Sequence, residues 1–221
     1  MDAVEEWRAA YGRVTDLVGS LGAEEAARRV PACPDWTVRD LLSHMIGLDA
    51  DVVAGDEPDD HNSTWTQRQV DARAGRTVGE LLEEWRSLVG PLTGWMQEFT
   101  TRPLGDLVIH EQDLRGALGR PGARDNAGLL SLRDRMLGRF EARLGAARPI
   151  ALYGGSWQWC SSGPASDAEV VVRASEFDLA RALMSRRSAA QIRRWTERGD
   201  VAPYLPAFET LGPLPADELD D

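Results

Sequence analysis

Residues 106–119 read DLVIHEQDLRGALG, and they predict one helix with two potential metal ligands on a single face. Asp106 and His110 are four residues apart, a spacing that places a carboxylate and an imidazole one helical turn apart. Pro103 lies at the expected first turn of this helix, and Gly119 is expected to end it. The helix therefore presents an oxygen ligand and a nitrogen ligand side by side.

A third potential ligand, His44, lies far upstream in another predicted helix. Thr37 and Asp40 have the spacing of a capping box at the start of that helix, and its apolar stripe directs His44 toward the interior of a helical bundle or its rim. Catalytic divalent metals commonly take three protein ligands and leave a position for water or substrate. Helical bundles build such sites from inward side chains on facing helices. We therefore predict that His44, Asp106 and His110 bind one divalent metal.

The spacing alone leaves another interpretation open, because an aspartate four residues before a histidine is common. Asp106 could cap its helix or form a salt bridge there, His110 could be a hydrogen-bonded, partly buried residue, and His44 could be unrelated to both. Asp113, one turn after His110, either orients a ligand imidazole or pairs with an arginine at the surface. Arg115 either meets a substrate carboxylate or is solvated.

Other reactive or aromatic side chains are expected to be structural. His61 lies in a polar segment that could rim a pocket, although a histidine in a loop is more often solvated. Cys33, between two prolines, is expected to be a small buried apolar residue and not the nucleophile. The tryptophans are expected to lie in the core (Trp36, Trp85 and Trp95) or at an interface between domains (Trp157 and Trp159).

The composition excludes several classes of function. The chain has 221 residues, a net charge of −11 and two cysteines. The acidic balance argues against nucleic-acid and anionic-membrane partners, which need basic patches. Two cysteines are too few for a disulfide framework or a four-cysteine metal site. The acidic N-terminus is unlike a signal peptide, and no apolar run approaches the roughly 18 residues of a membrane span, so we expect a cytoplasmic protein.

The periodicity of the sequence predicts two domains of different character. Apolar residues recur at helical spacing through about the first 146 residues, whereas PIALYGGSWQWC and AEVVVRAS have the alternation and β-branched residues of strands. We therefore predict an α+β protein. Its expected parts are an N-terminal four-helix bundle (1–146), a small C-terminal α/β domain (147–214) and an acidic tail that is disordered surface (215–221).

Several stretches resemble, in order, the mycothiol-dependent maleylpyruvate isomerase family: CPDWTVRDLLSHMIG, WTQRQVDARAGRTVGELLEEW, DLVIHEQDLRGALG, SRRSAAQIRRW and GDVAPYLPAFETLGPLP. The resemblance covers about residues 5–214, and its N-terminal motifs are the more specific. It implies a DinB-like four-helix metal-binding domain followed by a smaller α/β domain. It also implies that His44, Asp106 and His110 bind a divalent metal, usually zinc. The family's characterised isomerase has a glutamate where this chain has Asp106.

The resemblance further implies a thiol-dependent reaction. A metal-bound thiol loses its proton, and the thiolate is the nucleophile. In an isomerase the thiolate adds to an activated double bond, the adduct rotates, and elimination gives the other isomer; an S-transferase keeps the adduct. We therefore expect an isomerase or S-transferase that acts on a small electrophilic substrate with a low-molecular-weight thiol, such as mycothiol.

Other possibilities remain open at the level of the sequence. A non-catalytic DinB-like binding or regulatory module could keep the fold and a structural metal, and a metal-dependent hydrolase could use the same three ligands. Zinc is the expected metal, with nickel, manganese and iron as alternatives. The chain could be a monomer or a homodimer.

Overall fold

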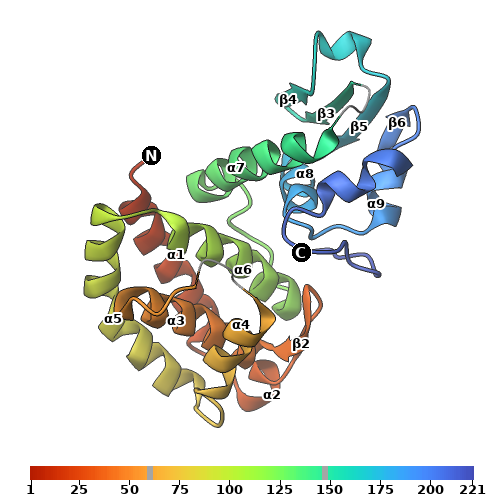
Figure 1. Ribbon diagram of the computed structural model, residues 1–221. Coiled ribbons are helices and arrows are strands. Elements are labelled where there is room, and N and C mark those ends of the chain that lie inside the picture. Colours follow the sequence, from red (N-terminus) through yellow and green to blue (C-terminus); the bar gives the residue numbers. More distant parts are fainter. Residues whose placement is uncertain (59–61, 146–148) are drawn as a thin grey trace. The chain divides into compact units, whose positions relative to one another are not determined.

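The computed structural model describes residues 1–58, 62–145 and 149–221, and its contacts divide the chain into two compact units (Figure 1). The first unit comprises Met1–Ala123 together with Asp221, and the second comprises Arg124–Asp220. Every helix of the described residues is too short or too polar to cross a lipid bilayer.

The division by contacts differs from the predicted domain boundary because of one helix. Helix α7 (Ala127–Leu144) precedes the predicted boundary at residues 146 and 147. It contacts α8 (Glu176–Leu183) and the 3₁₀ segment η2 (Ala202–Phe208), which both belong to the second unit. The apolar face of α7, which suggested a bundle helix, is therefore buried within the C-terminal unit.

The first unit is a bundle of four long helices, α1 (Ala3–Val18), α3 (Val38–Ala54), α5 (Val78–Glu98) and α6 (Arg102–Leu118) (Figure 1). Both α1 and α3 pack against α5 and α6. The connections contain two short helices, α2 (Ala23–Ala26) and α4 (Ser63–Asp71), and an antiparallel hairpin of β1 (Arg29–Val30) and β2 (Cys33–Thr37). The predicted bundle is confirmed, with α6 in place of α7 as its last helix.

Side-chain caps fix where three of these helices begin. Asp2 accepts hydrogen bonds from the backbone N–H groups of Val4 and Glu5. Thr37 and Thr77 each accept one from the backbone N–H three residues on, and the carboxylate of that third residue accepts from the backbone N–H of the cap. Each box satisfies two donors that the first helical turn leaves without a partner. The predicted start of α3 is therefore confirmed.

Aromatic side chains of α1 and α5 form part of the bundle core. Trp7 and Trp85 are fully buried, and their rings meet edge to face with centroids 6.4 Å apart. The ring of Tyr11 lies 4.9 Å from that of Trp85, also edge to face. Such pairs contribute about 0.5–1.5 kcal/mol beyond the burial of their area. The core position predicted for Trp85 is confirmed, whereas Trp95 is only half-buried.

The second unit contains a four-stranded sheet in the order β4-β3-β5-β6. Its strands are β3 (Ile150–Gly154), β4 (Trp157–Cys160), β5 (Val170–Ala174) and β6 (Thr196–Arg198), and the remaining elements are η1 (Ala165–Asp167) and α9 (Ala189–Arg194). Strands β3 and β4 form an antiparallel hairpin within the stretch that the sequence predicts as strand, and β3 runs parallel to β5. Helix α8 packs on β3 and β5, and α7 packs on α8. The predicted α/β character of the C-terminal region is confirmed.

Two tryptophans that were predicted to face the bundle contact α7. The ring of Trp157 lies 4.6 Å from the guanidinium of Arg133, and the ring of Trp159 meets Phe140 edge to face at 5.8 Å. The predicted interface therefore lies on the helix that the prediction had assigned to the bundle. These contacts are internal to the second unit.

The prediction that the acidic tail is disordered surface is wrong for its middle part. Leu219 is buried, and the side-chain amide of Gln191 in α9 donates to its carbonyl oxygen at 2.9 Å. Glu218 forms an ion pair with Arg194, also in α9. The sequence offered no sign of this contact, because one leucine among acidic residues has no periodicity.

A buried carboxylate fixes α6 against α1. Glu111 has no solvent exposure, and Arg13 of α1 donates to both of its oxygens, with Nη2 2.9 Å from Oε2. Arg115, one turn further along α6, donates to Oε1 at 3.0 Å. Glu6 approaches Arg13 at 3.4 Å from a more exposed position. Because Arg13 contacts both carboxylate oxygens, the pair fixes the orientation of the two side chains as well as the distance between them.

We expect Glu111→Gln to destabilise the protein by roughly 3–5 kcal/mol, because it leaves two partly buried guanidinium groups without their carboxylate. Urea unfolding measures this change. The matched control, Glu6→Gln, removes a rim contact of the same arginine and should cost no more than about 1 kcal/mol. Equal losses in the two variants would contradict the assignment.

Candidate metal centre

The side chains of His44, Asp106 and His110 converge between α3 and α6. Nε2 of His44 lies 3.7 Å from Asp106 Oδ1, and Nε2 of His110 lies 3.5 Å from the same oxygen. The side chains of His44 and His110 are 5% and 9% exposed, and that of Asp106 is 21% exposed. The carboxylate therefore lies on the more open side of the cluster. The structure brings together the three residues that the sequence proposes as ligands.

The spacing of these atoms fits ligands around one ion better than it fits direct hydrogen bonds. Two ligand atoms about 2.1 Å from a tetrahedral ion are about 3.4 Å apart, which is close to both N–O distances in the cluster. A charge-assisted N–H···O hydrogen bond is shorter, at about 2.7–2.9 Å. The side chain of Asp106 thus reaches the distance that an ion shared with both histidines requires, although it is shorter than a glutamate.

Hydrogen bonds at the far edge of each ring orient both imidazoles. His44 Nδ1 lies 2.7 Å from Oε1 of Gln69, and His110 Nδ1 lies 2.9 Å from Oδ2 of Asp113. Because both partners are acceptors, each Nδ1 acts as the donor, and in the neutral form of each ring the lone pair lies on Nε2, on the side of Asp106. This tautomer is the one that a metal ligand needs.

Gln69 is a site residue that sequence reasoning missed. It is buried in α4, and its side-chain N–H donates to Asp51 at 2.7 Å, which directs its oxygen toward His44. Helix α4 approaches α3 closely because residue 47 is glycine: a Cβ on Gly47 would lie only 2.4 Å from the Cβ of Gln69. The available signal was a polar residue one turn after the buried Trp65, on the inward face of the helix.

The three ligand candidates are strongly coupled electrically. Burial tends to raise the pKa of Asp106, but the imidazoles of His110 and His44 lower it well below its ordinary value. Burial tends to lower the pKa of His110, but the negative charge of Asp106 and the contacts with Asp113 and Cys33 raise it well above its ordinary value. Without a metal, the two shifts together favour a negatively charged Asp106 beside a positively charged His110.

A second carboxylate near the cluster is that of Asp49, on α3, and its surroundings favour the protonated form. Asp49 is buried, and its Oδ2 accepts a hydrogen bond from Trp85 Nε1 at 2.7 Å. Burial raises the pKa of Asp49 well above its ordinary value; the bond from Trp85 lowers it in part, and the charge of Asp106 raises it further. The sequence gave no sign of this residue, because its environment depends on packing between α3 and α5.

Two residues of β2 lie beside the cluster, and the predictions for both were wrong. Trp36, predicted in the core, is half-buried, with its ring centroid 4.9 Å from that of His44 and its N–H donated to Gln67. Cys33, predicted as a buried apolar residue, is half-buried, with Sγ 3.9 Å from Asp113 Oδ2. The physical reason is the position of the hairpin, which contacts α3 and α6.

Asp113 and Arg115, the two residues considered as neighbours of the ligands, have different roles in the structure. Asp113 is buried and bonds to His110, which agrees with the first of its two interpretations. Arg115 pairs with Glu111 and donates to the carbonyl oxygen of Arg120. Arg115 was expected to meet either a substrate carboxylate or solvent, and these protein partners differ from both. Its contacts link α6 to the loop that follows.

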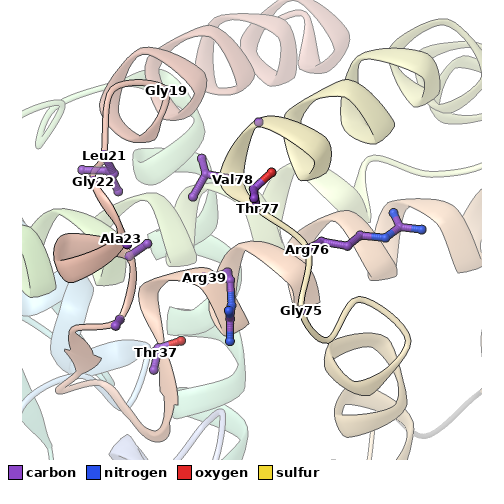
Figure 2. Close-up of a pocket in the computed structure, with 13 residues that line it drawn as sticks. Gly19, Leu21, Gly22, Ala23, Thr37, Arg39, Gly75, Arg76, Thr77 and Val78 are labelled. Carbon is purple, nitrogen blue, oxygen red and sulfur yellow. The ribbon is translucent and has the colours of Figure 1, made fainter.

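A cavity of about 410 Å³ in the first unit lies apart from the ligand cluster. Figure 2 shows Thr37 and Arg39 at the start of α3, and Thr77 and Val78 at the start of α5, among its lining residues. None of the three ligand candidates lines it. His61 was also considered as a residue at the rim of the site, but it lies outside the described residues.

Comparison with known families defines the class of the first unit. Residues 7–115 match the family described as the mycothiol maleylpyruvate isomerase N-terminal domain. The match lies within the first unit and includes all three ligand candidates, so the first unit is a domain of this kind.

Two solved structures share the fold over most of the chain. A crystal structure of the mycothiol-dependent maleylpyruvate isomerase is 14% identical with a TM-score of 0.58, and the match covers 84% of this chain and 88% of that one. A crystal structure of an alanine mutant of a histidine in the same-named enzyme is 13% identical with a TM-score of 0.56, over 82% and 87% of the two chains. The comparison with curated proteins found no match.

We expect Gly47→Ala to weaken both the fold and metal binding, because the new methyl group forces α4 and Gln69 away from His44. The stability loss should be on the order of 1–3 kcal/mol, and the zinc affinity should fall about tenfold or more. Thermal unfolding and competition with a zinc chelator measure the two effects. The control is Gly94→Ala, where a methyl group has no atom within 4 Å; it should leave zinc affinity unchanged. Unchanged zinc affinity in Gly47→Ala would refute the link between α4 and the site.

Metal affinity should rise with pH through the neutral range. The raised pKa of His110 keeps this imidazole protonated in the metal-free protein, and a cation must displace that proton. Each pH unit below the pKa of His110 should weaken binding about tenfold. Isothermal titration of zinc in buffers with different ionisation enthalpies counts the released protons. An affinity that stays constant between about pH 6 and 8 would show that His110 is not a ligand.

Proposed function

We propose that the protein is an enzyme that uses a divalent metal and a low-molecular-weight thiol of the mycothiol type. Its reaction is the isomerisation of a small electrophilic substrate or the transfer of the thiol to it. The observation that carries the proposal is the convergence of two imidazole nitrogens and one carboxylate oxygen, with both imidazoles oriented from behind.

The donor set favours zinc as the metal. Imidazole nitrogens suit zinc, nickel and iron, whereas manganese prefers a site richer in oxygen. Three protein ligands leave a coordination position open, as in catalytic zinc sites. When bound, the metal lowers the pKa of a thiol in that position, so that the thiolate is available at neutral pH.

The protein's own residues keep the ligands in place and balance charge. Gln69 and Asp113 hold the two rings so that neither imidazole has to reorient when it binds the metal. Asp106 supplies one negative charge on the more open side. The indole of Trp36 lies against His44 and provides an apolar, partly exposed wall. Such a wall limits the access of water, which would compete with the thiol.

The thiol in the proposal comes from the relatives. The matched family and both solved structures are named for a mycothiol-dependent maleylpyruvate isomerase. For this chain we propose the substrate class alone, a small molecule whose carbon–carbon double bond is activated for addition of sulfur. We also place the protein in the cytoplasm, where low-molecular-weight thiols stay reduced.

Thiol-dependent turnover by the zinc-loaded protein tests the proposal. The assay combines mycothiol or a simpler thiol with maleylpyruvate and with other activated cis alkenes, and follows isomerisation or adduct formation by NMR. We expect turnover to need both thiol and metal, and to fall at least about tenfold in His110→Ala. Cys160→Ser, which changes a cysteine of the sheet in the second unit, is the control and should retain activity.

Two results would contradict the proposal and identify the alternative. Turnover of esters or amides with water alone, without any thiol, would indicate a metal-dependent hydrolase. Stoichiometric metal without thiol-dependent thermal stabilisation and without turnover would indicate a binding module with a structural metal. Metal content that is equal in the wild type and in the double variant His44→Ala, His110→Ala would refute the site itself.

A further inference from the structure

A second set of ligand atoms lies at the opposite edge of the His110 ring. Atoms of Cys33, His110 and Asp113 that could each bind a cation lie within 4.8 Å of one another. Cys33 Sγ is 3.9 Å from Asp113 Oδ2, and the same oxygen is 2.9 Å from His110 Nδ1. His110 therefore belongs to two ligand sets, one at each edge of its ring.

The hairpin holds the thiol at this position. Cys33 is the first residue of β2 and pairs with Val30 of β1. Prolines precede and follow it at positions 31 and 34, and their fixed φ angles limit the freedom of this turn. The hairpin contacts α6 and α3. The buried Asp113 and His110 thus lie beneath a half-buried thiol, which leaves an approach from solvent.

We propose that Cys33, His110 and Asp113 form a second cation site that is selective for thiophilic ions. A thiolate, an imidazole and a carboxylate are a softer donor set than the two imidazoles and carboxylate of the first site, and a thiolate ligand shifts the preference toward soft ions such as cadmium and copper(I). A tetrahedral ion about 2.3 Å from sulfur and 2.1 Å from oxygen separates these atoms by about 3.6 Å. The observed Sγ–Oδ2 distance of 3.9 Å needs only a small adjustment.

The shared imidazole makes the two sites mutually exclusive. A neutral imidazole has one nitrogen with a lone pair and one that carries a proton. Binding at the first site uses the Nε2 lone pair, while the Nδ1 proton is donated to Asp113. Binding at the second site uses the Nδ1 lone pair, so the ring proton moves to Nε2 and the thiol proton of Cys33 is released to solvent. The first site then retains only His44 and Asp106.

Cadmium titration tests this inference independently of the proposed enzymatic activity. A cadmium–thiolate bond has a charge-transfer absorption in the ultraviolet that nitrogen and oxygen ligands do not produce. Wild-type protein should develop this band with one equivalent of cadmium and release previously bound zinc. Cys33→Ser should lose the band and bind cadmium at least about tenfold more weakly, with its zinc affinity retained.

Two further variants separate the two sites. His44→Ala removes a ligand of the first set alone, so it should lose zinc affinity about tenfold or more and keep the cadmium band. Cys160→Ser is the control for the other thiol and should keep both. A band that persists in Cys33→Ser, a band that disappears in Cys160→Ser, or cadmium binding that leaves zinc in place would overturn the inference. Circular dichroism confirms that each variant is folded.

Discussion

The three candidate ligands can converge only if α6 is rotated about its axis so that His110 faces α3. The ion pair of Glu111 with Arg13 fixes this rotation. Consecutive residues of a helix point about 100° apart. When Glu111 faces the guanidinium of Arg13 in α1, the preceding His110 faces α3 and His44. Asp106 and Asp113 lie one turn before and one turn after His110, on nearly the same face. A carboxylate with no exposure and two guanidinium partners therefore aligns three site residues at once.

The second imidazole depends on a longer series of contacts that begins at a glycine. Without a side chain at position 47, α4 lies close enough to α3 for Gln69 to reach His44. Asp51, two turns after His44 on α3, takes the amide N–H and so determines which end of Gln69 faces the ring. The two histidines are thus oriented in different ways. The acceptor for His110, Asp113, lies on the same helix, α6. The acceptor for His44, Gln69, lies on α4, which can approach α3 only because residue 47 is glycine.

This difference explains how much the sequence could predict. Capping boxes, apolar stripes and the four-residue spacing of Asp106 and His110 are local features, so the start of α3 and the candidate ligands could be predicted from the sequence. Asp113 could be considered from the sequence for the same reason, because it lies one helical turn after His110. Gln69, Trp36 and Cys33 reach the site only through the packing of α4 and the hairpin on the bundle.

The assignment of α7 failed for a related reason. Its apolar stripe shows that the helix buries one face, and periodicity carries no information about which partner covers that face. Four long helices already form the bundle, which leaves no position in it for α7. The aromatic residues Phe140 and Phe208, whose ring centroids are 4.5 Å apart, show that the partner lies in the C-terminal unit.

The raised pKa of Asp49 bears directly on the proposed chemistry. A divalent cation beside Asp106 has one uncompensated positive charge, which matches the single negative charge of a thiolate. An ionised Asp49 near the same cluster would cancel that charge and raise the cost of binding an anion. Trp85 donates a hydrogen bond that would stabilise ionised Asp49, but burial outweighs it. In the proposed reaction, the packing of α3 against α5 would therefore leave the positive charge of the bound cation available to an anionic thiol.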